Sequence, residues 1–191
     1  MSETVRPDPR SLRALAHPLR LQLLGALRLD GPATASALAR RFDETSGATS
    51  YHLRQLARHG FVAEEPGRGT ARERWWRAAH QGTKLDVSRT LGEPDTAQAL
   101  DFILREQLEI EVRALRAWWA GRESWPKEWL DASDSSDWGM RLTLDELSAL
   151  SREVHEIVDR RAAATRDRPA DPGTPVVRVF FRALPERPPP P

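Results

Sequence analysis

Apolar side chains recur every three or four residues in four short segments of the first 60 residues, which predicts four helices. Ser11 is expected to cap the first helix and Thr34 the third. Pro18 and Gly31 bracket the second helix, because proline suits the first turn of a helix and glycine suits its end. Gly60 fits a left-handed cap at the end of the fourth helix. The expected inward faces are Leu12, Leu15 and Ala16; Leu19, Leu23, Leu24 and Leu27; Ala35, Leu38, Ala39 and Phe42; and Leu53 and Leu56.

The pattern changes from helical spacing to strand character after residue 60. Residues 61–65 and 73–78 are expected to form strands. The segment PGRG at 66–69 supplies turn chemistry between them. The first 80 residues therefore predict four helices followed by a β-hairpin.

The second half of the chain predicts longer helices. Residues 96–119 form one periodic segment, and a short helix is expected near Pro126. The segment TLDE at 143–146 is a capping box that opens another helix. Strand-like segments at 138–142 and 176–184 flank this helix, so we expect a small βαβ unit whose strands pair within one chain or between two. The apolar stripe of the long helix consists of Leu100, Ile103, Leu104, Leu108, Val112, Leu115 and Trp119.

These elements predict a mainly α fold with small β. A helix-and-hairpin domain precedes a connector, a long helix and a small α/β region, and the chain ends in a Pro-rich tail. The expected division is a flexible N-terminus at 1–9, the helix-and-hairpin domain at 10–80, a linker at 81–95, a C-terminal domain at 96–184 and a Pro-rich disordered tail at 185–191.

Composition narrows the class of protein. The chain has no run of about 18 apolar residues, the length that a membrane-spanning helix needs. The start, MSETVRPDPRSLR, lacks the apolar core of a secretory signal, so we expect a cytoplasmic protein without membrane contact. The chain has no cysteine, which excludes disulfides, thiolate metal ligands and a cysteine nucleophile.

Charge divides unevenly between the two halves of the chain. Residues 1–80 carry 13 Arg and 8 acidic side chains, a net charge of +5. Residues 81–191 carry 16 basic and 20 acidic side chains, a net charge of −4. A basic first half joined to an acidic second half is typical of a nucleic-acid reader fused to a module that does not bind nucleic acid.

The fourth predicted helix begins with side chains that pack poorly and acquires a core face only later. Its start, TSGATSYH, offers short polar groups that let a backbone approach another surface closely. A DNA major groove admits such a helix, and short donors and acceptors near the helix start would read base edges. Thr45 is the expected cap, and Arg54 would reach phosphate or a guanine. The expected base-edge group is Ser46, Ala48, Ser50 and Tyr51, with His52 packed against the preceding helix or reaching a phosphate.

The hairpin tip supports the same function, because a cationic wing beside this helix would contact the DNA backbone. Two interpretations of the tip stay open. Its arginines contact phosphate, or they are solvated charges paired with Glu64, Glu65 and Glu73. We favour phosphate because the arginines gather at a glycine turn. The expected wing contacts are Arg68, Thr70, Arg72 and Arg74.

Three stretches in this order carry a resemblance to a known family. AHPLRLQLLGAL, ATASALARRF and TSYHLRQLARHGFV, followed by a hairpin containing GRG, resemble the winged helix-turn-helix of ArsR-type bacterial transcription regulators over residues 10–80. The resemblance implies a homodimeric DNA-binding regulator, commonly a repressor, with a pseudo-palindromic operator on double-stranded DNA. Family members that sense metals use Cys, His and acidic ligands. This chain has no Cys and no His cluster, so metal sensing is not carried over, and we expect no metal and no cofactor.

Two features of the second half leave alternatives open. The long apolar stripe covers its own domain or pairs with the same stripe of a second copy, and we favour the pairing because one winged helix reads one half-site. The tryptophans either close a small core, which we favour, or line a pocket for a small-molecule effector. The pocket candidates are Trp118, Trp125, Trp129 and Trp138.

Two other classes of function compete with DNA binding. A winged helix can instead serve as a protein–protein interaction module without specific DNA binding. An enzyme is not expected, because the chain has no nucleophile–base pair at motif spacing, no metal cluster and no phosphate-binding loop.

Overall fold

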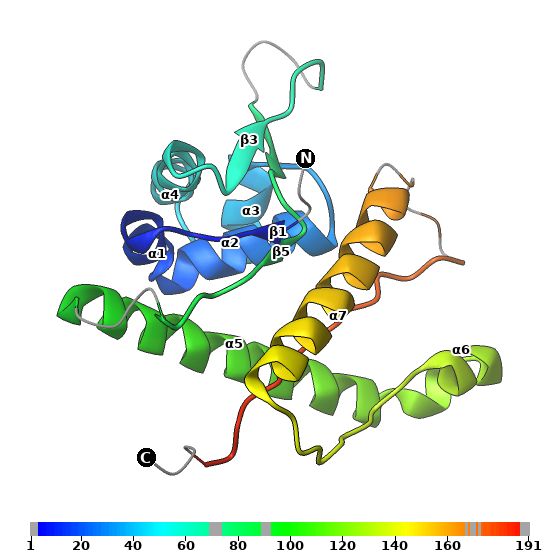
Figure 1. The fold of residues 1–191 in the computed structure, drawn as a ribbon. Coiled ribbons are helices and arrows are strands. Elements are labelled where there is room, and N and C mark those ends of the chain that lie inside the picture. Colours follow the sequence, from blue (N-terminus) through cyan, green and yellow to red (C-terminus); the bar gives the residue numbers. More distant parts are fainter. Residues whose placement is uncertain are drawn as a thin grey trace. The chain divides into compact units, whose positions relative to one another are not determined.

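The computed structural model describes residues 4–68, 74–88, 93–166, 168, 171 and 173–187. It shows the mainly α fold with small β that the sequence predicts (Figure 1). The chain divides into two compact units, Met1–Gln107 and Leu108–Pro191, each described separately below. Their boundary falls inside the long helix α5 (Pro94–Ala120).

The four helices predicted in the first unit are confirmed. They are α1 (Pro9–Leu15), α2 (Pro18–Leu29), α3 (Ala35–Arg41) and α4 (Ser46–Arg58). The side chain of Thr34 caps α3 by accepting from the Ala37 amide, as predicted. Gly31 and Gly60 have positive φ angles of 84° and 73°, which confirms their left-handed conformation at the helix ends.

The predicted cap of α1 is wrong. Asp8 is the N-cap residue, and its carboxylate accepts a hydrogen bond from the Ser11 amide at 2.7 Å. Helix α1 therefore begins two residues before Ser11. Pro9 occupies its first position, where the missing N–H of proline costs nothing.

The predicted hairpin is confirmed, although residues 69–73 of its tip lie outside the described residues. Strand β3 (Val62–Glu64) pairs antiparallel with β4 (Trp75–Ala78), in a register that sets Glu64 opposite Trp76. A further strand that the sequence did not predict, β2 (Ala33–Thr34), pairs with the other edge of β4. The sheet order is β2-β4-β3.

A second small sheet corrects the expectations for the N-terminus and the linker. Within the expected flexible segment 1–9, β1 (Thr4–Val5) pairs in parallel with β5 (Gly82–Thr83) from the expected linker. Backbone hydrogen bonds between the two strands hold these two segments together within the first unit.

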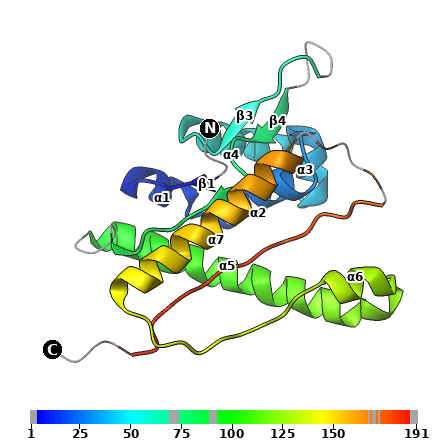
Figure 2. The same cartoon turned by 45° about the vertical axis from the view of Figure 1, so that its right-hand side comes forward.

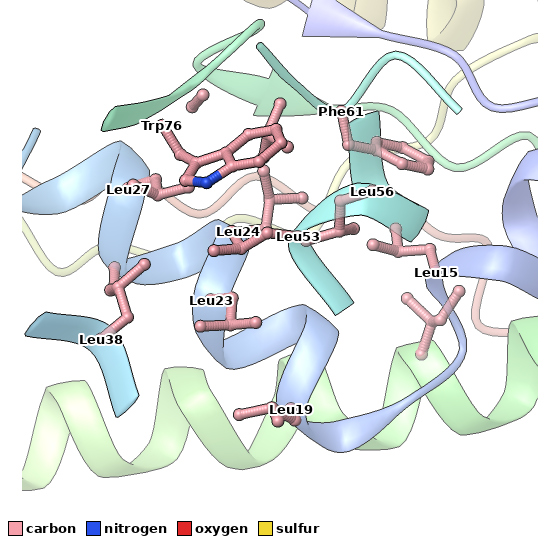
Figure 3. Close-up of a cluster of buried hydrophobic side chains, with 14 of the residues drawn as sticks. Leu15, Leu19, Leu23, Leu24, Leu27, Leu38, Leu53, Leu56, Phe61 and Trp76 are labelled. Atoms are coloured by element: carbon pink, nitrogen blue, oxygen red, sulfur yellow. The ribbon is translucent and has the colours of Figure 1, made fainter. Parts of the chain in front are cut away.

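One apolar core holds the first unit together. Figure 3 shows leucines of α2 and α4 meeting Phe61 and Trp76 from the hairpin. Leu100 and Ile103 bring the first turns of α5 into the same core. The buried members of the core are Leu12, Leu15, Leu19, Leu23, Leu24, Ala26, Leu27, Leu38, Leu53, Leu56, Phe61, Val62, Trp76, Ala78, Leu100 and Ile103.

Arg28 ties the end of α2 to the segment that follows the hairpin. Its guanidinium donates to the carbonyl oxygens of His80 and Gly82 at 2.9 and 3.0 Å, and to Thr83 Oγ1 at 2.8 Å. Part of the side chain stays exposed, but loss of solvent around the guanidinium lowers the pKa of Arg28 to about 10. The group stays charged at neutral pH, so all three hydrogen bonds are charge-assisted.

The second unit contains the end of α5, a 3-10 turn (Arg122–Ser124), α6 (Lys127–Ala132) and α7 (Leu144–Thr165). The short helix near Pro126 is confirmed. The capping box is confirmed as well, because Thr143 Oγ1 accepts from the Glu146 amide while the Glu146 carboxylate accepts from the Thr143 amide. These hydrogen bonds lower the pKa of the Glu146 carboxyl.

Residues 138–142 and 176–184 do not form strands here, so the βαβ unit paired within one chain is wrong, and pairing between two chains stays a prediction. Figure 2 draws both segments as coil, one before and one after α7 in the sequence. Alternating apolar residues indicate only a tendency to form strands. A strand also needs a hydrogen-bonded neighbour, and neither segment has one among the described residues. Of the described residues of this unit, none is fully buried.

None of the described helices has both the length and the apolar character needed to cross a bilayer.

Candidate nucleic-acid interface

Helix α4 has an exposed amino end and an anchored carboxyl half. Ser46 and Gly47 are exposed, Tyr51 is 50% exposed, and Ala48 and Ser50 are half-buried. On the opposite face Thr49 and Leu53 are fully buried. The helix therefore presents small polar groups outward while its other face fixes it to α2 and α3.

The amino end of α4 also carries the positive end of the helix dipole. Thr45 caps the helix as predicted, since its Oγ1 accepts from the Ala48 amide at 3.1 Å. The remaining amides of a first turn have no partner within a helix. No acidic residue occupies this first turn, so its amides stay open to an anion, although Asp43 and Glu44 directly precede the cap.

Two histidines stack directly behind the exposed face. The rings of His17 and His52 have centroids 4.3 Å apart, and Tyr51 meets His52 edge-on at 5.2 Å. His17 caps α2 by accepting the Leu19 amide at its Nδ1, 3.2 Å away. His52 thus packs against the preceding helix, which leaves Tyr51 as the exposed aromatic ring of α4.

Both imidazoles sit where a positive charge is unfavourable. Burial is the main cause that lowers the pKa of His17 and His52, and the nearby charge of Arg20 adds to it, while Glu44 opposes the shift. His52 Nδ1 and Arg20 Nε are buried without a hydrogen-bond partner among the described residues. Both rings therefore favour the neutral form in the folded protein.

The free energy of unfolding of the first unit is expected to fall as the pH drops through about 6.5, the ordinary histidine pKa. The unfolded chain takes up protons at this pH, while His17 and His52 of the folded protein stay neutral. The contribution of these two histidines to the free energy of unfolding is therefore fully present above this pH and decreases below it. Urea unfolding between pH 8 and pH 5 measures the slope, in a range above the carboxyl titrations.

Two sets of variants identify which histidines cause this dependence of the free energy of unfolding on pH. His17→Asn keeps a side-chain cap and, combined with His52→Gln, should remove the share of the pH dependence that these two rings cause, while His59, whose pKa is also lowered, contributes the rest. His155→Gln, in the second unit, should leave it unchanged. An equal slope in all three proteins would contradict this origin.

The wing combines paired and unpaired arginines. Arg74 forms an ion pair with Glu64 at 3.0 Å, as the solvated-charge alternative expects. The Arg68 guanidinium lies 5.6 Å from the centre of the Trp75 ring and has no acidic partner among the described residues. Thr70 and Arg72 lie outside the described residues.

The expected dimerisation stripe divides between the two units. Leu100 and Ile103 are buried in the core of their own chain, which corrects their placement on a surface for a partner. Leu104 packs against that core. The exposed members of the stripe are Leu108, Leu115 and Trp119, with Val112 half-buried.

The four tryptophans considered for an effector pocket do not form one aromatic cluster. Trp118 contacts Trp119 at 6.3 Å between ring centroids, and Trp125 contacts Trp129 at 6.4 Å. Trp138 is 73% exposed and makes no ring contact with another described residue. The favoured core interpretation is also not met, because no tryptophan of this unit is buried.

Sequence reasoning missed His17 and Arg20 as parts of this site. The signal was present as HPLR at 17–20, where a histidine before proline occupies a cap position and Arg20 follows in the first turn of α2. The fold alone shows that this turn lies against α4. The described part of the chain contains no group of three His, Asp or Glu side chains placed to hold a metal ion.

Comparison with known proteins identifies one segment. Residues 15–65 match a protein family described as a helix-turn-helix domain. Solved structures that match include reduced HlyU from Vibrio cholerae N16961, with 24% sequence identity and a TM-score of 0.31, over 49% of this chain and 81% of that chain. No curated protein matches the sequence.

Proposed function

We propose that this chain is a sequence-specific DNA-binding transcription regulator, a homodimeric repressor of the ArsR type acting on a pseudo-palindromic operator. The observation that carries the proposal is the exposed, capped amino end of α4 within the helix-turn-helix segment 15–65. Helices α3 and α4 are the helix-turn-helix pair of this segment. Helix α4 is the second of the two, the one that reads the major groove in helix-turn-helix proteins.

Base reading and backbone contact are assigned to different parts of the surface. Ser46, Ser50 and Tyr51 have short or planar polar groups suited to base edges. Arg54, exposed one turn further along α4, reaches phosphate or guanine. Arg68 contacts phosphate from the wing, with Trp75 orienting its guanidinium from below.

Variants at these positions should change DNA binding in two distinct ways. Arg68→Ala should weaken binding to all sequences by a similar factor and reduce the salt dependence, because one phosphate contact is lost. Tyr51→Ala should change which sequences are preferred. Both are measured by mobility shift at several salt concentrations, on the DNA flanking the protein's own coding region and on randomised DNA.

Arg116→Ala, an exposed arginine of the second unit, is the control and should bind as the unaltered protein does. If neither substitution at the site changes binding, the surface assignment fails. If the unaltered protein shows no salt-dependent shift at all, the protein-interaction alternative replaces DNA binding.

Dimerisation through the exposed end of the α5 stripe follows from the operator geometry. One α4 reads one half-site, and two half-sites one helical turn apart need two copies held in fixed geometry. Leu108, Leu115 and Trp119 remain available for a symmetric contact on one face of α5.

Leu115→Glu should convert a dimer to a monomer at micromolar concentration, because it sets like charges across a symmetric apolar contact. Ala117→Glu places the same charge on the opposite face of α5 and should leave the dimer intact. Sedimentation velocity measures both. A strict monomer in the unaltered protein, with and without DNA, would contradict the proposal.

A further inference from the structure

A polar groove lies between α1 and the carboxyl end of α4, away from the helix end assigned to base reading. These two helices pack together in the first unit (Figure 1). The groove has a volume of about 440 Å³ and is lined by Asp8, Arg10, Ser11, Gln55, Arg58 and His59. That volume falls in the range of small-molecule sites, but the lining is polar where most such sites are apolar.

The groove is rich in hydrogen-bond donors that the protein does not use. Arg10, Gln55, Arg58 and His59 each carry side-chain N–H groups, and none of these side chains donates to an acceptor among the described residues. Neither arginine forms an ion pair there. Water can satisfy these exposed and half-buried groups, but four side chains with donors around one groove also suit an acceptor-rich ligand.

The acceptor within the groove is already engaged. The Asp8 carboxylate accepts from the Ser11 amide, and that hydrogen bond is the main cause that lowers its pKa. His59 lies within electrostatic reach of Arg10, Arg58 and Arg20, with Asp8 as the opposing charge. Cations therefore outnumber anions, and burial together with these arginines lowers the pKa of His59.

We propose that this groove binds a phosphate group, with Arg10 and Arg58 as charge-assisted donors from two sides and His59 and Gln55 as further donors. The phosphate belongs to a small phosphorylated molecule or to a nucleic-acid backbone. The volume of the groove exceeds that of one phosphate group, which leaves space for the rest of a small ligand. Bound phosphate joins α1 to the end of α4, and its negative charge raises the pKa of the His59 imidazole.

Free phosphate tests the groove without DNA. The ring signals of the five histidines of the full-length chain are followed by NMR while inorganic phosphate replaces chloride at constant ionic strength. The His59 signals should shift with saturation, and the pKa of His59 should rise. Arg10→Gln and Arg58→Gln should each weaken binding by about tenfold, the loss expected for one charge-assisted hydrogen bond.

Arg116→Gln is the matched control and should bind phosphate as the unaltered chain does. Sulfate keeps two negative charges between about pH 5 and pH 8, where histidine titrates, and should bind more tightly as His59 becomes protonated. The two groove arginines are exposed, so their variants should fold, and circular dichroism checks this.

Mobility shifts with the same variants identify the source of the phosphate. Saturable phosphate binding with unchanged DNA affinity in the variants assigns the groove to a free ligand. No saturation with free phosphate, but equal loss of DNA affinity in both groove variants and none in Arg116→Gln, assigns it to the DNA backbone. A linear, unsaturated shift together with unchanged DNA affinity overturns the proposal. A failure of the unaltered protein to bind DNA would refute the proposed function and leave the free-phosphate result to decide the groove.

Discussion

Replacing Ser46 by Glu is expected to lower DNA affinity by about 100-fold, because a carboxylate brought against DNA meets like charge that costs several kcal/mol. Ser46 is the first residue of α4 and is exposed. If the amino end of α4 enters the major groove, a carboxylate there lies between two phosphate backbones. It also cancels the positive end of the helix dipole that attracts them.

The same substitution is expected to leave the fold at least as stable. An acidic side chain in the first turn of a helix stabilises it by about 0.3–1 kcal/mol, and the first turn of α4 has none. The two effects therefore have opposite signs, which separates a lost DNA contact from a damaged fold. Mobility shift and thermal unfolding measure them in one preparation.

Gln98→Glu adds the same charge at an exposed position of α5 and serves as the control. It should lower DNA affinity by no more than a few-fold, through net charge alone. Equal losses in the two variants would mean that the first turn of α4 is not at the DNA surface.

Leu53→Ala is expected to cost about 3–4 kcal/mol of the free energy of unfolding, within the range for buried leucines. Leu53 is fully buried where α4 meets α2 (Figure 3). Its removal leaves a cavity under the helix that carries the proposed reading surface. The surrounding core is closed by Phe61 and Trp76, so little collapse around the cavity is expected.

Leu144→Ala is the control for this cost. Leu144 is also helical, but it is 80% exposed. Its loss should stay below about 1 kcal/mol, because little apolar surface leaves water. Urea unfolding followed by circular dichroism compares the two. Similar costs for both leucines would contradict the account of how α4 is anchored.

Features set by neighbours in sequence were predictable. Thr34, Thr45 and Thr143 cap their helices as expected, because a cap needs only the amide three residues on. Gly31 and Gly60 end helices because glycine reaches the left-handed conformation without strain. Asp8, which displaced Ser11 as a cap, shows that two cap-forming residues three apart need structure to separate them.

Features set by distant neighbours were not predictable. Strands β1 and β5 have two residues each and pair across nearly 80 positions, so no periodicity marks them. The three acceptors of Arg28 come from residues 80–83, and nothing near Arg28 in sequence announces them. Conversely, residues 176–184 have a strand pattern but no partner strand in the part of the chain that the structure describes.

The candidate site also combines features that the sequence predicts with features that only the packing of helices reveals. The exposure of Ser46 and Tyr51 and the burial of Leu53 follow from the periodicity of one helix. The stacking of His17 on His52 joins two helices and required their packing angle. The burial of Leu100 and Ile103 required knowing that the start of α5 completes the first core.

Site-directed cleavage tests most directly whether the amino end of α4 enters duplex DNA. The chain has no cysteine, so Ser46→Cys creates a unique thiol to which an iron–EDTA cleavage reagent can be attached. Strand cleavage is expected at two clusters of positions about one helical turn apart, in the major groove of each half-site. Conjugates at Ser133→Cys, an exposed position in the second unit, are the reference. Cleavage from Ser46→Cys that is absent or no more localised than from Ser133→Cys, on DNA that the conjugate still binds, would contradict the central claim.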